Sequence, residues 1–272
     1  MNFNQLFDAF SYTFMRNALI GGVLISLCAA LLGVCLVLRR FSMIGDGLSH
    51  VGFGAIAVAA AAGIAPLRIA VPIVMIAAVC LLRINESGKL NGDSATAVIS
   101  TGSLAVGVIA ASLSGSNVDL NNYMFGSILA MKSSYVAVSV VLTAVILIMY
   151  LLLYNRIFAM TFDESFSKAI GQKTDFYTDL IAVLTAVTVV VGMQMMGALL
   201  MSSFIIFPSL IAMRVSKSFK STVIASAVIS VITFILGLFI SFYLNTPAGA
   251  TVVAVDLALF IVVGVASRLR RA

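Results

Sequence analysis

Asp46 and His50 are the two residues whose types and spacing most clearly suit chemistry. They lie four apart in the segment RRFSMIGDGLSHVGFGAIAVA, and on a helix this spacing puts both side chains on one face. A carboxylate oxygen and an imidazole nitrogen on one face supply half of a tetrahedral Zn²⁺ site, or part of a larger Mn²⁺ or Fe²⁺ shell. The alternative is that His50, the only histidine in the chain, donates a hydrogen bond to Asp46 and serves helix packing.

An aspartate and three methionines are further candidates for an ion pathway. Asp256 lies within the apolar run VVAVDLALF, where a charge is costly and needs a polar partner. It pairs with such a group, lines a pathway or completes a metal site. Met193, Met195 and Met196 bring together thioethers, which suit soft metals, although methionine more often fills gaps in a core.

The composition places these residues in a membrane protein. Of the 272 residues, 62% are hydrophobic and 10% are charged, against about 25% charged residues in a typical soluble domain. The longest polar interval, residues 155–179, is too short for a separate water-soluble catalytic or nucleic-acid-binding domain. The net charge of +6 is therefore interpreted as a loop bias that orients the chain in a membrane, and no nucleic-acid partner is expected.

Hydropathy predicts an all-α polytopic membrane protein with about nine transmembrane helices in a single domain over residues 1–272. A spanning helix needs about 20 apolar residues because the hydrocarbon core is about 30 Å thick. The segments 177–194 and 197–213 could form one bent element, which would leave eight helices. The predicted spans are 17–38, 44–62, 66–82, 95–113, 134–155, 177–194, 197–213, 221–243 and 250–267.

The cations predict the orientation of these spans. When the loops are placed alternately on two sides, one side keeps only Arg16, Arg68 and Lys132 of the 16 cations. The positive-inside rule then puts the N-terminus outside the cell and the C-terminus in the cytoplasm. The cations on the cytoplasmic side are Arg39, Arg40, Arg83, Lys89, Arg156, Lys168, Lys173, Arg214, Lys217, Lys220, Arg268, Arg270 and Arg271.

Two amphipathic segments are predicted outside the spans. Residues 1–16 carry apolar residues at helical spacing, which predicts a short helix in the membrane interface. In the cytoplasmic region 157–176, Thr161 and Glu164 form a capping box for a short helix that Gly171 ends. Its apolar face either lies on the membrane or fits a groove on a cytoplasmic partner. The residues of that face are Phe162, Phe166, Ala169 and Ile170.

The motifs of nucleotide-binding and hydrolytic enzymes are absent from the sequence. No GxxxxGK[ST] is present, so the chain is not expected to bind a nucleotide by itself. HExxH and GxSxG are absent as well, and one histidine with few intramembrane acids gives little support to a membrane-embedded hydrolase. An ion-coupled secondary transporter or channel would have the same composition.

Four segments resemble motifs of the zinc/manganese-type family of ABC transporter permeases. From Arg39 to Ala57 the chain has the family's basic pair, an aromatic residue and GDxxSH before a small-residue helix. MMGALLMSSFIIFPSLIAMR resembles the family's G-x-L-L…P…A segment, FDESFSKAIGQKTDFY its coupling-helix region, and SFYLNTPAGATVVAV its late S-x-Y…P-x-G segment. The motifs follow in the expected order over essentially the whole chain. Asn245 departs from the pattern, because many relatives carry an acid there.

The resemblance implies a type II ABC importer-like permease, the membrane subunit of an ATP-driven importer in the plasma membrane of a prokaryote. Two copies of the chain would pair with ATP-binding subunits, which hydrolyse ATP, and with an extracytoplasmic metal-binding protein. Asp46 and His50 would line or gate the metal path, and no permanently bound cofactor is expected. The residues implied to couple the permease to the ATPase are Phe162, Asp163, Glu164, Phe166, Ala169, Ile170 and Gly171.

The transported metal is expected to be Zn²⁺, with Mn²⁺ or Fe²⁺ as alternatives. The form GDGLSHVGFGA resembles zinc-type members of the family slightly more than manganese-type members. Two copies of Asp46 and His50 facing a two-fold axis would supply four ligands. The predicted span puts the pair near the cytoplasmic end of its helix. It is therefore an inner gate, unless residues 39–44 re-enter the membrane.

Overall fold

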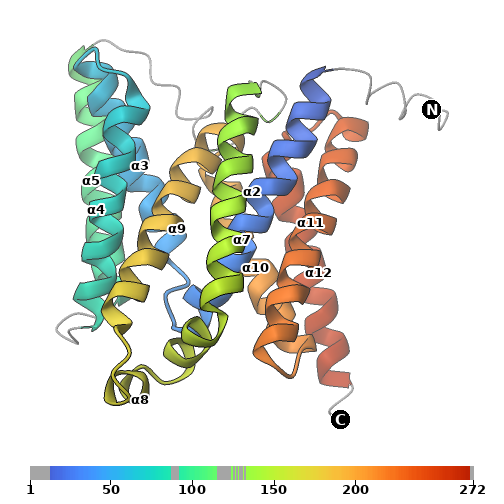
Figure 1. Ribbon diagram of the computed structural model, residues 1–272. Coiled ribbons are helices and arrows are strands. Elements are labelled where there is room, and N and C mark those ends of the chain that lie inside the picture. Colours follow the sequence, from blue (N-terminus) through green and yellow to red (C-terminus); the bar gives the residue numbers. More distant parts are fainter. Residues whose placement is uncertain are drawn as a thin grey trace.

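The regular structure is helical throughout the described part of the chain, as predicted (Figure 1). The structure is a computed structural model that describes residues 13–86, 92–114 and 133–269 and the single positions 124, 126, 128 and 131. The helices are α2 (Thr13–Leu38), α3 (Ile44–Ala61), α4 (Pro66–Glu86), α5 (Gly92–Ser114), α7 (Ser133–Phe162), α8 (Glu164–Ala169), α9 (Thr174–Met196), α10 (Ala198–Val215), α11 (Phe219–Leu244) and α12 (Ala248–Leu269).

Among the described residues, nine helices are long and apolar enough to cross a membrane, which confirms the predicted count. Helices α9 and α10 are separate spans because Gly197, at φ 92°, breaks the chain between them, and the eight-helix alternative is wrong. Helix α2 begins at Thr13, so residues 13–16 belong to the first long helix. The rest of the predicted interfacial segment lies outside the described residues.

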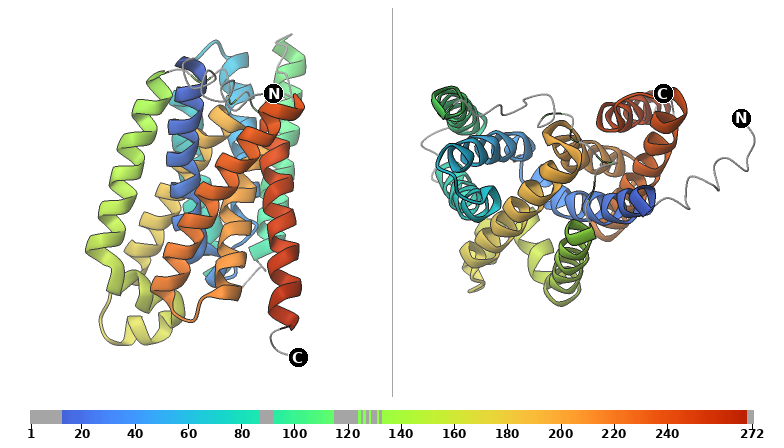
Figure 2. Two further views of the ribbon diagram at one scale, coloured as in Figure 1. Left: turned by 90° about the vertical axis from the view of Figure 1, so that its right-hand side faces the viewer. Right: turned by 90° about the horizontal axis from the view of Figure 1, so that it is seen from above.

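The bundle has two groups of helices on either side of α9. Viewed from above, α3, α4 and α5 stand together at one side, α11 and α12 stand at the other, and α9 crosses obliquely between them (Figure 2). Helix α10 packs against α2, α3, α9, α11 and α12 and so joins the two groups. Helix α2 starts at the upper end of the bundle and α12 finishes at the lower end, as an odd number of spans requires (Figure 1).

The core lies where α2, α3, α9 and α10 meet. Most positions of these helices are buried, whereas α5 and α12 bury few of theirs. The exposed apolar side chains of α5, such as Val98, Ile109 and Leu113, are those expected of a helix that faces lipid or another membrane subunit. The helices that carry the candidate residues thus differ in how much of their surface is buried.

Helices α3 and α5 approach closely because glycines replace side chains at their contact. A Cβ added to Gly54 would lie 2.4 Å from the carbonyl oxygen of Ser103, and one added to Gly107 would lie 2.7 Å from the Cα of Gly54. Small residues at such positions let helix backbones pack directly in a membrane. The contact holds α5 beside the residues of α3 that form the candidate site.

Gly54→Ala is expected to lower the thermal unfolding midpoint of the detergent-solubilised chain. The new methyl group would overlap backbone atoms of α5, which cannot rotate away, and overpacking of this kind costs about 1–3 kcal/mol. Gly102→Ala on α5 is the matched control, since nothing lies within 4 Å of the position of its new Cβ. Equal midpoints for the two variants would contradict direct packing of α3 on α5.

The short helix α8 lies at the lower end of the bundle between α7 and α9 (Figure 1). Its first turn is capped by Asp163, whose carboxylate accepts a hydrogen bond of 2.8 Å from the N–H of Phe166. The predicted capping box is wrong, because α7 continues through Thr161, whose hydroxyl donates to the carbonyl of Ile157. The predicted stop is confirmed: Gly171, at φ 80°, closes the helix with its N–H on the carbonyl of Lys168.

Candidate functional site

Asp46 and His50 lie in the first two turns of α3 and face the same cavity. The Nε2 atom of His50 is 3.7 Å from Oδ2 of Asp46, which is longer than a hydrogen bond. The His50 side chain is 27% exposed and that of Asp46 is 48% exposed. The hydroxyl of Ser202 on α10 lies 3.4 Å from Oδ1 of Asp46. The structure therefore brings the predicted pair together at one cavity, with both side chains partly exposed.

The cavity between α3 and α5 has a volume of about 480 Å³, and its lining mixes polar with apolar side chains. From α5 it receives Asp93, which sequence reasoning missed, together with Thr96, Ser100 and Thr101. Asp93 lies in the first turn of α5, as Asp46 does in α3. That shared position, an acid at the start of an apolar span, is the signal that could have singled it out.

One copy of the chain does not complete a metal site among the residues that the structure describes. No group of three or more histidine, cysteine, aspartate or glutamate side chains lies close enough there to hold one ion. The Nδ1 atom of His50 is buried and has no hydrogen-bond partner in that part of the chain. Asp46 and His50 thus bring two side chains of metal-ligating type to the cavity, fewer than a tetrahedral site needs.

Asp256 lies on α12 and is fully buried. Its Oδ2 atom accepts a hydrogen bond of 2.8 Å from the hydroxyl of Ser203, while its Oδ1 atom has no partner among the described residues. Ser203 follows Ser202 on α10, so the two neighbouring serines contact Asp256 and Asp46. The structure does not place Asp256 in the cavity, and its part in a pathway stays a prediction.

The three methionines are buried around α9 and outside the cavity. The methyl and sulfur atoms of Met193 fill the notch over Gly52, where a Cβ would lie 2.4 Å from the methyl carbon. Met195 accepts a hydrogen bond of 3.5 Å from the hydroxyl of Ser139, and Met196 is fully buried. These contacts are those of packing residues, and a role of the thioethers in metal passage stays a prediction.

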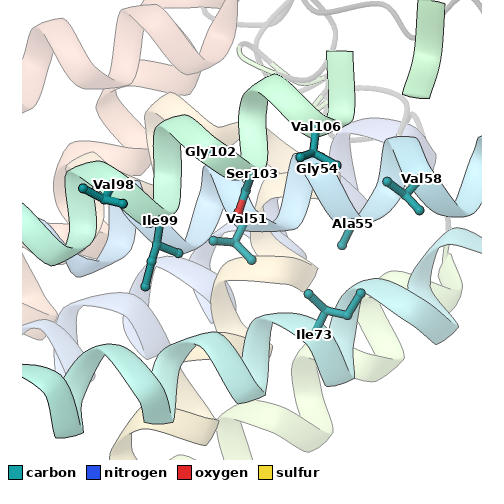
Figure 3. A pocket seen from close by; sticks show the side chains of 10 residues that line it. All are labelled: Val51, Gly54, Ala55, Val58, Ile73, Val98, Ile99, Gly102, Ser103 and Val106. Atoms are coloured by element: carbon teal, nitrogen blue, oxygen red, sulfur yellow. The ribbon is translucent and has the colours of Figure 1, made fainter. Parts of the chain in front are cut away.

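A second cavity lies between α3, α4 and α5, with a volume of about 400 Å³ (Figure 3). Its walls are mostly aliphatic, with Val51 and Val58 from α3, Ile73 from α4 and Val106 from α5. It contains no side chain that is charged or that commonly ligates metals. This cavity therefore offers no side chains of the metal-ligating type that Asp46 and His50 bring to the first one.

Exposed apolar side chains on and beside α8 form one face, as predicted. Phe162 at the end of α7, Phe166 within α8 and Ile170 just after it have exposed fractions of 61%, 59% and 55%. Ser167 is buried, so α8 sits with one side on the bundle and its apolar side outward. Ala169 and Gly171 are also exposed. The use of this face for coupling to an ATPase stays a prediction.

Glu164 fixes α8 to the bundle. Its Oε2 atom accepts a hydrogen bond of 2.6 Å from Arg39 at the end of α2, and its Oε1 atom is 2.7 Å from the Nζ atom of Lys168. Partial burial acts to raise the pKa of the Glu164 carboxyl, but the hydrogen bond from Lys168 and the charge of Arg39 outweigh it, so the pKa lies below its ordinary value. Glu164 is therefore ionised at neutral pH.

Comparison with known proteins assigns the chain to a family. The model of the ABC 3 transport family matches residues 11–267. The chain belongs to this family. This permease is 28% identical to the manganese import system permease protein ScaB of Streptococcus gordonii, over 92% of this chain and 90% of that one. It is also 28% identical to the high-affinity zinc uptake system membrane protein ZnuB of Haemophilus influenzae, over 90% of this chain and 94% of that one.

The fold of the permease is similar to that of PsaBC from Streptococcus pneumoniae, solved in complex with Fab. The TM-score is 0.85 at 27% sequence identity, with 96% of this chain and 95% of that chain covered. The predicted family and the predicted ABC importer-like permease fold are confirmed. The permease is a multi-pass protein of a prokaryotic plasma membrane and a transport subunit.

Proposed function

We propose that the permease carries Zn²⁺ across the membrane in an ATP-driven importer, past Asp46 and His50. One observation carries the proposal: the only histidine of the chain and a carboxylate share a cavity in a membrane-spanning bundle. An ionisable residue within a membrane span is costly and is usually functional. The imidazole nitrogen and the carboxylate oxygen are both ligands that Zn²⁺ accepts.

Two copies of the permease would complete the metal site. Each copy contributes Asp46 and His50, so a two-fold arrangement supplies two nitrogen and two carboxylate ligands, which suits tetrahedral zinc. Helix α5 lines the cavity, and few of its positions are buried within one copy. It therefore has the most exposed surface on which a second copy could pack. The homodimer is supported by the incomplete ligand set of one copy.

The other subunits are assigned from the two ends of the bundle. An ATP-binding subunit would dock on the apolar face at α8, and the cation bias of the loops puts this end in the cytoplasm. An extracytoplasmic metal-binding protein would deliver the ion at the opposite end. The N-terminus would then lie outside the cell and the C-terminus in the cytoplasm.

Mn²⁺ is the second candidate for the cargo, and one feature of the cavity favours it. Asp93, Thr96, Ser100 and Thr101, which carry side-chain oxygen atoms, line the same cavity as Asp46. Mn²⁺ prefers a larger shell that is richer in oxygen. Fe²⁺ accepts a similar mixture of ligands. ScaB and ZnuB, at equal identity to this chain, differ in the metal that their names give.

The test is uptake by the reconstituted importer, assembled with its ATP-binding subunit and its metal-binding protein. Zn²⁺, Mn²⁺ and Fe²⁺ are compared side by side, with and without ATP. The proposal expects ATP-dependent uptake that is fastest with Zn²⁺. Faster uptake of Mn²⁺ would move the assignment to the second candidate. Uptake driven by a proton gradient in the absence of ATP would instead identify a secondary transporter and refute the proposal.

A further inference from the structure

Arg39 joins three separate parts of the cytoplasmic end of the bundle. Its Nη2 atom donates to Oε2 of Glu164 on α8 at 2.6 Å, and its Nη1 atom donates to the hydroxyl of Thr178 on α9 at 2.9 Å. The Arg39 side chain is only 8% exposed, so these polar contacts are made largely out of water. A single guanidinium thus connects the end of α2 with α8 and α9.

The chain from Arg39 to α3 is short and fixed by backbone hydrogen bonds. Arg40, at φ 63°, takes the left-handed conformation that ends α2. Its N–H donates a hydrogen bond to the carbonyl of Val37, and the N–H of Phe41 donates one to the carbonyl of Leu36. The carbonyl of Phe41 then accepts a hydrogen bond from the N–H of Ile44, where α3 begins. The Arg39 guanidinium lies over the ring of Phe41, 5.6 Å from its centroid.

The link between α2 and α3, residues 39–43, is directly followed by the candidate metal site. Asp46 lies in the first turn of α3, directly after the link, and His50 follows one turn later. A displacement of Arg39 would therefore shift the start of α3 and change the distance between these two side chains and Asp93 across the cavity. Helix α5 packs mainly on α3, so the cavity between them is set by how α3 is placed.

The charges make Arg39 and α8 move together. Separation of a largely buried guanidinium from its carboxylate would leave an uncompensated charge, which costs far more than an exposed ion pair contributes. The second carboxylate oxygen of Glu164 is held by Lys168, which keeps the carboxylate ionised and oriented. One short ion pair thus joins α8 to the end of α2.

We infer that Arg39 is the positioning residue that transmits movement of α8 to Asp46 and His50 at the start of α3. The inference rests on the proposed function, because it assigns a mechanical role within an ATP-driven importer. In this role Arg39 touches neither the metal nor the ATPase. It sets how much metal is moved for each ATP that is hydrolysed.

The test is the number of metal ions taken up per ATP hydrolysed in the assembled importer. Arg39→Gln removes the charge that holds Glu164, and this ratio is expected to fall about ten-fold, while ATP hydrolysis continues. The charge-exchanged double variant, Arg39→Glu with Glu164→Arg, is expected to recover part of the ratio. If Arg39→Gln does not assemble, Arg39→Lys serves instead. Lysine keeps the charge, but it lacks the planar guanidinium whose two nitrogens donate hydrogen bonds to Glu164 and Thr178 at once.

Arg83→Gln is the matched control. Arg83 on α4 forms an equally short but more exposed ion pair of 2.6 Å with Asp179, the residue after Thr178 on α9, and this pair joins α4 to α9. The ratio is expected to stay within about two-fold in this variant, as for an exposed pair. A ratio that falls equally in both variants would overturn the inference.

Two further results separate the inference from the proposed function. If uptake and hydrolysis fall in parallel in Arg39→Gln, so that the ratio is unchanged, Arg39 has only a structural role and the inference is overturned. If the unsubstituted importer takes up none of Zn²⁺, Mn²⁺ and Fe²⁺, the proposed function itself fails. Metal uptake by the unsubstituted importer with an unchanged ratio in Arg39→Gln would therefore remove the coupling role alone.

Discussion

His50→Ala is expected to lower ATP-driven metal uptake by about 100-fold or more. Loss of groups that only orient a metal ligand already costs about 10–100-fold, and His50 supplies the only imidazole that the chain can offer to the ion. The remaining carboxylates would bind a transition metal weakly and with little selectivity. The measurement is initial uptake of the preferred metal by vesicles that contain the complete importer, corrected for the amount of permease.

A second substitution separates a ligand from a packing residue. His50→Asn keeps a polar side chain with a hydrogen-bond donor, but the amide is a poor ligand for Zn²⁺. Uptake is expected to be lost in this variant as well. Full uptake by His50→Asn, together with loss in His50→Ala, would show that His50 acts through hydrogen bonding within α3 and would contradict its place in the metal path.

Phe166→Asp is expected to release the ATP-binding subunit from the permease. Phe166 is 59% exposed at the outer side of α8, and truncated aromatic anchors in protein interfaces typically cost 2 kcal/mol or more, which corresponds to about 30-fold in affinity. The substitution should leave α8 intact, because an acid is favourable in the first turn of a helix. The measurement is the binding affinity between purified permease and ATP-binding subunit in detergent.

Tyr243→Asp is the control for this substitution. Tyr243 is 66% exposed at the far end of α11, so the same change of an exposed aromatic residue to an acid takes place away from α8. It is expected to leave the affinity for the ATP-binding subunit unchanged. Phe162 is less suitable as a test site, since its ring also packs against Phe158 and Phe219. Equal affinities of Phe166→Asp and the unsubstituted permease would place the apolar face of α8 on the membrane instead.

The spans and the central pair could be predicted from the sequence because both depend on local patterns. Hydropathy over about 20 residues is set by the thickness of the bilayer, and all nine predicted spans coincide with helices. The spacing of Asp46 and His50 requires only that α3 be a helix. The prediction that one face carries both side chains therefore did not depend on how the bundle packs.

The partners of these residues could not be predicted, because they come from distant parts of the chain. Asp93 reaches the cavity because α5 packs closely on α3, with Gly54 and Gly107 at the contact. Ser202 comes to Asp46 from α10, and Arg39 reaches Glu164 across 125 positions of sequence. Such contacts depend on how whole helices pack against one another, which periodicity within one helix does not specify.

The capping box at α8 failed for a different physical reason. The pattern of Thr161 followed by Glu164 fits a helix start, but the apolar character of α7 continues to Phe162 and keeps Thr161 helical. The next residue, Asp163, then became the cap. Glu164 thereby lost its expected role in capping and became available for the ion pair with Arg39.

The most direct test of the metal site is the number of Zn²⁺ ions bound by the purified permease at equilibrium. A site shared by two copies predicts about one ion for every two chains, with each chain giving Asp46 and His50. The ion should be absent in His50→Ala, while the protein remains folded and dimeric. Undiminished Zn²⁺ binding by His50→Ala would contradict the assignment of this cavity as the metal path.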